Sequence, residues 1–231
     1  MKKLSVTTSW DDGQKIDMKL LDLMNKYELR GTFYATKSFR NNLSDEELLK
    51  IVKSKNEVGA HTLNHVNLTK VPISEAKEEI VGSKKYLEEL LDLEITMFCY
   101  PFGYFNEKVK DIVKSAGFIG ARSCNPEGMA SPNDRFELNI TLHASNSSPR
   151  LTFHIWKRNR LPARSLLDWE LRAKHLFDLS LRTGGIYHIW GHGYEYQRRD
   201  EWDKLERVFQ YISKNDNVKY LTNSESLRYE I

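Results

Sequence analysis

The chain has 231 residues, of which 40% are hydrophobic and 29% are charged, so its composition is that of a globular protein and excludes a disordered chain. Its length fits one sizeable domain, and we expect a single domain over residues 1–231. The formal net charge of +3 comes without a dense stripe of lysine and arginine, so nothing in the sequence favours nucleic-acid binding.

Hydrophobic periodicity and turn-forming residues predict alternating strands and helices along most of the chain. Ser44 followed by Glu47, for example, is a capping box, which is a start signal for a helix. The predicted strands are residues 4–9, 32–35, 57–61, 95–100, 118–121, 186–190 and 218–221. The predicted helices are residues 16–27, 44–52, 74–91, 106–116, 166–181 and 203–213.

Residues 123–149 contain many Asn, Ser and Pro, and this composition predicts long loops or irregular strands. The alternation on either side of them predicts a parallel sheet that closes, or nearly closes, into a (β/α) barrel. In such barrels the chemistry lies where the strands end and the loops begin. Functional residues are therefore expected directly after the predicted strands.

The first residues of the chain and its two cysteines indicate the cellular location. Residues 1–8 include two lysines, as a signal peptide does, but Asp11 and Asp12 arrive where the apolar run of such a peptide should be. The sequence contains no run of about 18 apolar residues, so no membrane-spanning helix is expected. Cys99 and Cys124 form neither a disulfide framework nor a zinc-ligand spacing. These features predict a cytoplasmic protein.

Two motifs after predicted strands can bind a metal ion. Asp11 and Asp12 are adjacent carboxylates that repel each other. A cation bound to one and a proton-accepting role for the other would remove this repulsion. The alternative is an Asp-Asp-Gly turn without function. His61 and His65 are four residues apart, so they would share one face of a helical turn and reach one ion; two solvated histidines are the alternative. Two histidines and one carboxylate form a catalytic metal set with open positions.

Two further motifs can supply catalytic groups. Residues 100–103 read Tyr-Pro-Phe-Gly, and Pro101 with Gly103 holds a specific turn whose exposed N–H can serve an oxyanion; an ordinary strand-to-helix turn is the alternative. His188, Trp190 and His192 face one way on a strand. We expect His188 to be a buried structural histidine, and His192, nearest the strand end, to be a general acid.

Taken in order, Asp11-Asp12-Gly13, His61-Thr62-x-x-His65, Pro101-Phe102-Gly103 and the late His192 resemble the motifs of the polysaccharide deacetylase (NodB-homology, carbohydrate esterase) family over about residues 5–195. The resemblance implies a distorted (β/α) barrel, usually with seven parallel strands. It implies hydrolysis of an N- or O-acetyl group, mostly on carbohydrate. It also implies one divalent ion, with zinc the first expectation and cobalt, nickel or manganese as alternatives.

The resemblance also assigns roles to individual residues. It implies that Asp11 is the general base and that Asp12, His61 and His65 are the metal ligands. It implies that the backbone N–H of Phe102 is the oxyanion donor and that His192 is the general acid. Several aromatic side chains can stack on sugar faces or line a small apolar pocket, and among them we expect Tyr100 and Trp190 to contact the substrate; the others are Trp10, Phe102 and Tyr194.

The chain departs from the family pattern at three positions, one of which, Trp10 in place of the more usual Phe before the acids, is expected to be harmless. Many members have an arginine two residues before the motif proline, where it orients the base, and this chain has Cys99 there. We expect Arg122, at the end of the following strand, to supply the guanidinium instead. The usual Asp-Trp motif is also missing, because Asp168-Trp169 comes too late and opens a helix. Glu195 is one candidate for the partner of His192.

Three functions remain open from the sequence. The first is deacetylation of an acetylated sugar or sugar conjugate. The second is hydrolysis of another C–N bond, in a formamide or a cyclic imide, by the same chemistry. The third is a non-catalytic carbohydrate-binding relative. The departures from the family pattern favour it, but all the metal ligands, the base and the late histidine are present, which argues against it. A structural zinc domain is not expected, since no fourth Cys or His stands at closed-site spacing.

Overall fold

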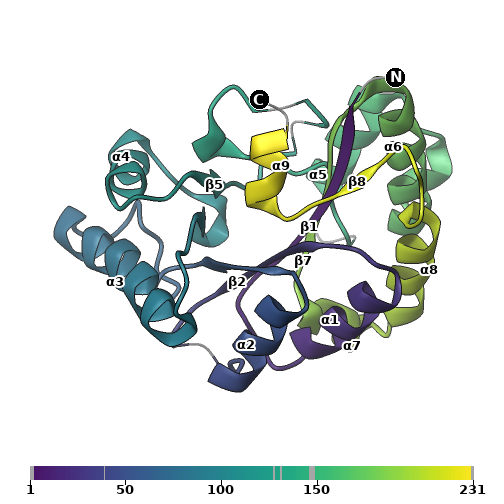
Figure 1. Cartoon of the computed structure of the whole chain (residues 1–231). Coiled ribbons are helices and arrows are strands. Elements are labelled where there is room, and N and C mark those ends of the chain that lie inside the picture. Colours follow the sequence, from purple (N-terminus) through teal and green to yellow (C-terminus); the bar gives the residue numbers. More distant parts are fainter. Residues whose placement is uncertain (1–2, 39, 127, 131, 146–148, 230–231) are drawn as a thin grey trace.

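The computed structural model describes residues 3–38, 40–126, 128–130, 132–145 and 149–229. In this part of the chain, strands alternate with helices (Figure 1). The strands are β1 (Leu4–Trp10), β2 (Gly31–Ala35), β3 (Glu57–Ala60), β4 (Met97–Cys99), β5 (Gly120–Arg122), β6 (Leu142–His143), β7 (Gly185–Gly191) and β8 (Lys219–Tyr220). The helices are α1 (Asp17–Lys26), α2 (Asp45–Lys53), α3 (Ile73–Leu91), α4 (Glu107–Ser115), α5 (Pro149–Asn159), α6 (Trp169–Thr183), α7 (Gly193–Arg199), α8 (Trp202–Ile212) and α9 (Asn223–Tyr229), with short 3-10 helices η1 (Pro101–Gly103), η2 (Arg135–Glu137) and η3 (Ala163–Leu166).

The sheet is parallel in every strand pair of the described residues, in the order β5-β4-β3-β2-β1-β7-β6, and β8 adds a short strand against β1. Helices surround it, with α3 and α4 at the left, α1, α2 and α7 at the bottom, and α6 and α8 at the right of Figure 1. The predicted fold is confirmed, since seven parallel strands form a curled half-barrel.

The central strand β1 is buried on both faces, as parallel strands usually are. Its side chains alternate between the two faces. Val6 and Trp10 join the main hydrophobic core with the surrounding helices. Thr7 and Ser9 lie between them on the other face, where the Ser9 hydroxyl is 2.8 Å from Nε2 of His188 on β7. Thr7 and Ser9 of β1 therefore face the inside of the half-barrel, whereas Val6 and Trp10 pack against its helices.

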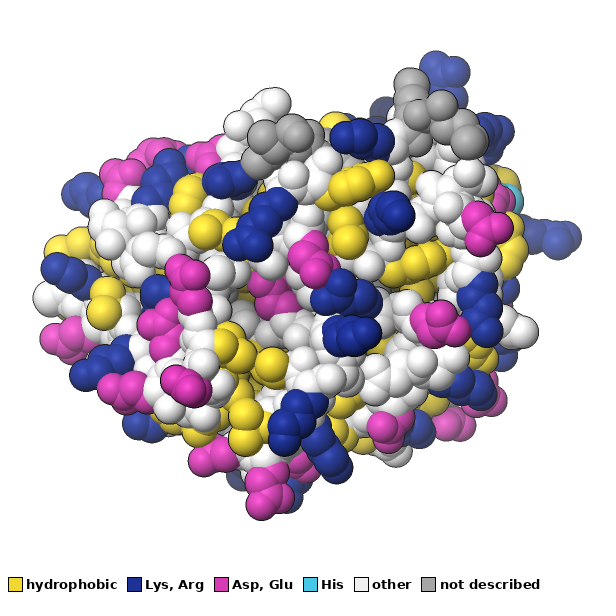
Figure 2. Space-filling view, viewed as in Figure 1, with side chains coloured by type: hydrophobic (Ala, Val, Ile, Leu, Met, Phe, Trp, Pro, Cys, Tyr) yellow, Lys and Arg dark blue, Asp and Glu magenta, His cyan; other side chains and the backbone are white. Residues whose placement is uncertain are grey.

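Helix α9 lies at the amino ends of the strands. Its first residue, Asn223, donates from Nδ2 to Thr7 Oγ1 at 2.8 Å and accepts the hydroxyl of Tyr34 at 2.9 Å. Leu227 packs into the small apolar cluster inside the half-barrel. Figure 1 shows α9 beside β1, and Figure 2 shows that cationic and anionic side chains are interspersed over this face. The opposite, carboxyl ends of the strands are left for a functional site.

All the predicted helices and strands are present in the described residues, with ends that shift by a few residues. The capping box is confirmed, because Ser44 Oγ accepts the N–H of Glu47 while the carboxylate of Glu47 accepts the N–H of Ser44. Asp168 does open a helix, since it accepts the N–H groups of Glu170 and Leu171, so α6 begins at residue 169 rather than 166. No helix in the described part of the chain combines the length and apolar character needed to cross a bilayer.

The sequence did not predict β6, α5, α7 or α9. Strand β6 has two residues, and α7 and α9 have seven each, so none is long enough to establish a hydrophobic period. Helix α5 lies at the end of the stretch for which loops or irregular strands were predicted. Strand β6 matters for function, because it places His143 next to β7.

Candidate metal and catalytic site

A pocket of about 600 Å³ opens at the carboxyl ends of the strands. Its walls come from residues that directly follow β1, β3, β4, β5 and β7, or that end β7. The lining residues are Asp11, Asp12, His61, His65, Phe102, Cys124, Trp190, His192 and Tyr194. The half-barrel thus brings together the residues that the sequence analysis placed in four separate motifs, at the end of the sheet where α/β folds carry their sites.

Asp12, His61 and His65 form a set of donors that fits one divalent ion. Their ligand atoms all lie within 4.8 Å of one another. Asp12 Oδ1 is 3.8 Å from Nε2 of His61 and 3.3 Å from Nε2 of His65. This oxygen is buried and accepts no hydrogen bond from the described residues, although a buried carboxylate oxygen normally has a partner. An ion between the three donors would supply that partner, and zinc accepts this mixture of nitrogen and oxygen ligands.

The ligands are fixed by the backbone around them. Gly13, after Asp12, has a φ of +62°, and a Cβ there would lie only 3.0 Å from Cα of Ala35, so the loop after β1 needs glycine. Nδ1 of His61 lies 2.8 Å from the carbonyl oxygen of Cys99 and donates its proton to it. Burial lowers the pKa of His61 to about 3, which keeps the ring neutral. Its Nε2 therefore carries a lone pair, and this atom lies 3.8 Å from Oδ1 of Asp12 and 3.9 Å from Sγ of Cys99.

The two histidines do not share a helical turn, so the reason given for their pairing was wrong. The loop after β3 is irregular, and Thr62 (φ 63°) and His65 (φ 53°) adopt the left-handed region. The carboxylate of Glu79 on α3 holds the loop, because it accepts the N–H groups of Leu63 and Asn64, each at 2.9 Å. The two imidazoles still meet edge to face, with ring centroids 4.8 Å apart.

Asp11 is a buried carboxylate with a cationic partner. Its Oδ2 accepts hydrogen bonds from the guanidinium of Arg122 and, at 2.8 Å, from the indole N–H of Trp190. Burial alone would raise the pKa of Asp11, but Arg122, His61 and His192 together outweigh it and hold the pKa well below its usual range. Nη2 of Arg122 also lies 2.7 Å from Sγ of Cys99. The placement of Arg122 thus agrees with the sequence-based expectation, while its part in catalysis stays a prediction.

Phe102 stands in a strained turn at the pocket, with a φ of 60°. Within this turn the N–H of Gly103 donates to Tyr100 O, and that of Tyr104 donates to Pro101 O. No hydrogen bond among the described residues uses the N–H of Phe102. Phe102 lines the pocket, and its ring lies 4.6 Å from the ring of His65. An unused donor in this place can serve an oxygen of the substrate.

His192 directly follows β7. Its ring contacts a buried carboxylate. Oε2 of Glu195, three residues later on α7, is 3.2 Å from Nδ1 of His192. The same oxygen is 2.8 Å from Nε2 of His143 on β6. Burial would lower the pKa of His192, but the hydrogen bond with Glu195 and the charges of Asp11 and Asp12 raise it. His143 was not found from the sequence, because it lies in the stretch without a motif.

Two of the five aromatic residues do not reach the pocket. Tyr100 is fully buried, stacks on Phe105 with ring centroids 4.7 Å apart and donates its hydroxyl to Phe136 O at 3.1 Å. Its expected contact with the substrate is therefore wrong. Trp10 is fully buried in the main core. Trp190 lines the pocket as expected, together with Phe102 and Tyr194.

His188 is a buried structural histidine, as the sequence analysis expected. It lies outside the pocket lining, and Nδ1 donates to Asn139 O at 2.9 Å while Nε2 meets Ser9 Oγ. Burial lowers its pKa to about 3 from an ordinary value of 6.5. Below pH 6.5 the unfolded chain therefore binds a proton at this residue that the folded chain refuses, so stability is lost as the pH falls from 6.5 towards 3.

We expect the free energy of unfolding of metal-free protein to fall by about 2–3 kcal/mol more in the wild type than in the His188→Gln variant when the pH drops from 7.5 to 4.5. The variant loses hydrogen bonds at every pH, so the readout is the difference in slope, measured by urea unfolding at several pH values. His61 contributes the same fall to both proteins and cancels. Equal slopes in the two proteins would mean that His188 does not titrate on unfolding.

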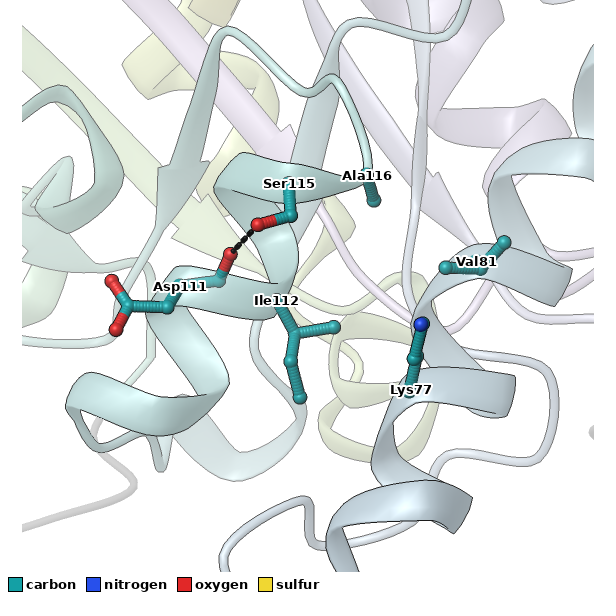
Figure 3. A pocket seen from close by; sticks show the side chains of 6 residues that line it. All are labelled: Lys77, Val81, Asp111, Ile112, Ser115 and Ala116. Atoms are coloured by element: carbon teal, nitrogen blue, oxygen red, sulfur yellow. Dashed lines mark hydrogen bonds between the residues drawn. The ribbon is translucent and has the colours of Figure 1, made fainter.

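A second hollow, of about 290 Å³, lies between α3 and α4. Figure 3 shows Ile112 directed into the gap towards α3, and the carboxylate of Asp111 pointing away from Lys77. The hydroxyl of Ser115 donates to the backbone oxygen of Asp111 at 2.7 Å, so it is already used. This hollow lacks the convergent polar groups of a ligand site, in contrast to the pocket at the strand ends.

Known proteins resemble this chain in both sequence and fold. A peptidoglycan-N-acetylglucosamine deacetylase of Bacillus cereus is 25% identical over 154 residues, which cover 64% of this chain and 71% of that protein. The peptidoglycan-N-acetylmuramic acid deacetylase PdaC of Bacillus subtilis is 28% identical over 151 residues, which cover 64% of this chain but only 32% of that protein.

Among solved structures, the Xyl-CE4 domain of a multidomain xylanase from the hindgut metagenome of Trinervitermes trinervoides has the same fold, with a TM-score of 0.64 and 14% identity over 100% of this chain and 92% of that domain. The family model for polysaccharide deacetylase matches residues 1–121, which is more than half of the chain and includes the two aspartates, the two histidines and the Phe102 turn. The chain therefore belongs to the polysaccharide deacetylase family.

Proposed function

We propose that this chain is a metal-dependent hydrolase that removes acetyl groups from acetylated amino sugars. The observation that carries the proposal is the cluster of Asp12, His61 and His65, whose ligand atoms lie within 4.8 Å beside the buried carboxylate of Asp11. A divalent ion bound by these three residues supplies Lewis acidity to the acetyl carbonyl and to the attacking water. The cytoplasmic location and the single-domain organisation expected from the sequence stay predictions.

Asp11 has the geometry of a general base. Arg122 and Trp190 both bind its Oδ2, which fixes the orientation of the carboxylate. Its Oδ1 is buried and accepts no hydrogen bond from the described residues. That oxygen is therefore free to take a proton from a water molecule that enters the pocket. Arg122 helps to maintain the ionised state required for this step.

Two other groups complete the reaction. The N–H of Phe102 can donate to the carbonyl oxygen of the acetyl group as negative charge develops on it. Burial would lower the pKa of His192, but Glu195 and the two aspartates raise it, which favours the protonated form that a general acid needs. His192 can give this proton to the departing nitrogen or oxygen of the sugar.

The pocket lining suits the apolar face of a sugar next to the acetyl group. Phe102, Trp190 and Tyr194 offer aromatic surface, and no lysine or arginine lines the pocket among the described residues. The named activities of the Bacillus relatives, on N-acetylglucosamine and N-acetylmuramic acid of peptidoglycan, support an N-acetylated substrate.

Product release tests the proposal, measured as acetate from acetylated substrates, formate from a formamide and ring opening of a cyclic imide. The panel comprises N-acetylglucosamine oligosaccharides, an O-acetylated xylan, a formamide and a cyclic imide, each with protein as purified, after chelation, and after addition of zinc, cobalt, nickel or manganese. We expect hydrolysis of the N-acetyl substrates. Chelation should remove at least about 90% of the rate, because no side chain replaces the Lewis acidity of the ion, and at least one added metal should restore the rate. Preference for the imide or formamide would favour the other C–N hydrolase. Stoichiometric metal binding without hydrolysis of any substrate would indicate a non-catalytic relative.

A further inference from the structure

We propose that His143, a residue of β6 outside every family motif in this chain, is a positioning residue for proton donation by His192. It acts through Glu195, which it holds in place between the two histidines. The inference rests on the proposed function and deepens it, because it assigns the support of the general acid to a residue with no counterpart in the quoted motifs.

The first observation is a shared carboxylate. Oε2 of Glu195 lies 2.8 Å from Nε2 of His143 and 3.2 Å from Nδ1 of His192. The side chains of His143 and Glu195 are 7% and 8% exposed, whereas that of His192 is 16% exposed and lines the pocket. Because Glu195 holds Nδ1 of His192, the nitrogen left to act on a substrate is Nε2.

The second observation fixes the direction of the hydrogen bond from His143. Burial lowers the pKa of His143 despite the neighbouring Glu195, so the ring is neutral and carries one N–H. The hydroxyl of Ser145 lies 3.2 Å from Nδ1 and can donate to it. The proton of His143 is then on Nε2 and points at Glu195. Burial would raise the pKa of Glu195, but the hydrogen bonds from His143 and His192 pull it well below the usual range.

The third observation is that the sheet itself holds the ring of His143. His143 pairs with Trp190 of β7, and the N–H of Ala144 donates to Trp190 O at 2.8 Å. The rings of His143 and Trp190 are 4.3 Å apart and inclined by 30°. Since the indole N–H of Trp190 binds Asp11, this one strand pair supports both the base and the acid.

These contacts predict what the loss of His143 does. Without the N–H of His143, His192 is the one hydrogen-bond partner left to the Glu195 carboxylate among the described residues, and the carboxylate can rotate about its own side-chain bonds. His192 then loses a fixed orientation, and its proton is presented to the leaving group in fewer of the bound complexes. The hydrogen bonds of His143 with Glu195 and Ser145 do not involve the metal ligands or Asp11, so binding of the ion and activation of water should continue.

The test uses two substrates that differ in their need for an acid. A sugar amide must have its nitrogen protonated before it leaves, whereas 4-nitrophenolate leaves 4-nitrophenyl acetate without a proton. The matched variants are His143→Gln, whose amide can reach Glu195 and donate to it, and His143→Asn, which is polar but too short. Each is measured with its full metal complement, and His143→Leu is added as the apolar variant.

We expect His143→Asn to lower kcat for an N-acetylglucosamine oligosaccharide about 10- to 100-fold, a part of the usual contribution of an acid, with KM within about twofold. Its rate with 4-nitrophenyl acetate should stay within about threefold, and His143→Gln should recover most of the loss on the sugar. Equal losses on both substrates would show a merely structural role and overturn the proposal, as would an unchanged rate on the sugar.

The same assay distinguishes failure of the proposed function from failure of the role of His143. If the wild type releases acetate from neither substrate, the proposed function fails and the positioning role of His143 fails with it. If the wild type is active and the variants lose the sugar reaction only, both stand. If the wild type is active and the variants match it, the proposed function survives and only the role of His143 is removed.

Discussion

Asp11→Asn is expected to lower kcat for acetate release by about 10²–10⁴-fold, the usual contribution of a general base. An amide has nearly the shape of the carboxylate, and its oxygen can still accept the hydrogen bonds that Arg122 and Trp190 give to Asp11. It cannot accept a proton from water at neutral pH. The loss should therefore appear in kcat while the metal content, measured by elemental analysis, stays near one ion per chain.

Asp17→Asn is a matched control, because it makes the same change at another buried aspartate close by. Asp17 accepts the N–H of Gln14 at 2.9 Å and does not line the pocket. Burial raises its pKa to about 8, so the folded protein holds it protonated at pH 7 and an amide mimics it closely. This variant should keep kcat within about threefold. If Asp11→Asn retained more than a tenth of the wild-type rate, Asp11 would not be the base.

The metal site could be predicted from sequence because of the way parallel sheets are built. Asp12 follows β1 and His61 follows β3, and the carboxyl ends of parallel strands meet at one edge of the sheet. Chain order and strand ends were enough to bring these residues together. The local conformation was not, since the positive φ of Thr62 and His65 depends on Glu79 of α3, which is distant in sequence from the motif.

Tyr100 was misplaced although the sequence contained the needed information. Side chains alternate along a strand, so Cys99 inside the half-barrel requires Phe98 and Tyr100 to face outward. Cys99 does lie inside, beside Asp11, and the ring of Tyr100 contacts Phe98 at 5.5 Å in the outer core. Applying this alternation to the residue after Cys99 would have excluded Tyr100 from the site.

His143 could not have been predicted in the same way. Its strand has two residues, so no alternation is visible, and the residues before it form an irregular segment with one short 3-10 helix. Its function depends on the pairing of β6 with β7, which is a contact between residues about 47 positions apart. Only the folded chain supplies that contact.

Arg122→Met is expected to lower kcat by about 10²–10³-fold with little change in the number of ions bound, because Arg122 touches the base and none of the three proposed ligands. Methionine keeps much of the apolar length of the side chain and removes the guanidinium. Arg122 is fully buried, so its loss leaves the carboxylate of Asp11 without a cation and should cost about 3–5 kcal/mol of stability. Thermal unfolding, metal analysis and acetate release measure the three effects separately.

Two companion variants show which property of Arg122 matters. Arg122→Lys keeps the charge but loses the planar fork that bonds Asp11 and the sulfur atoms of Cys99 and Cys124 together, so it should recover stability more than rate. Cys99→Arg combined with Arg122→Ala moves the guanidinium to the position that many family members use. Because Cys99 Sγ lies 3.7 Å from Oδ2 of Asp11, an arginine there can reach the base, and part of the lost rate should return. A wild-type rate in Arg122→Met alone would remove Arg122 from the mechanism, and Trp190 would then be the group that orients Asp11.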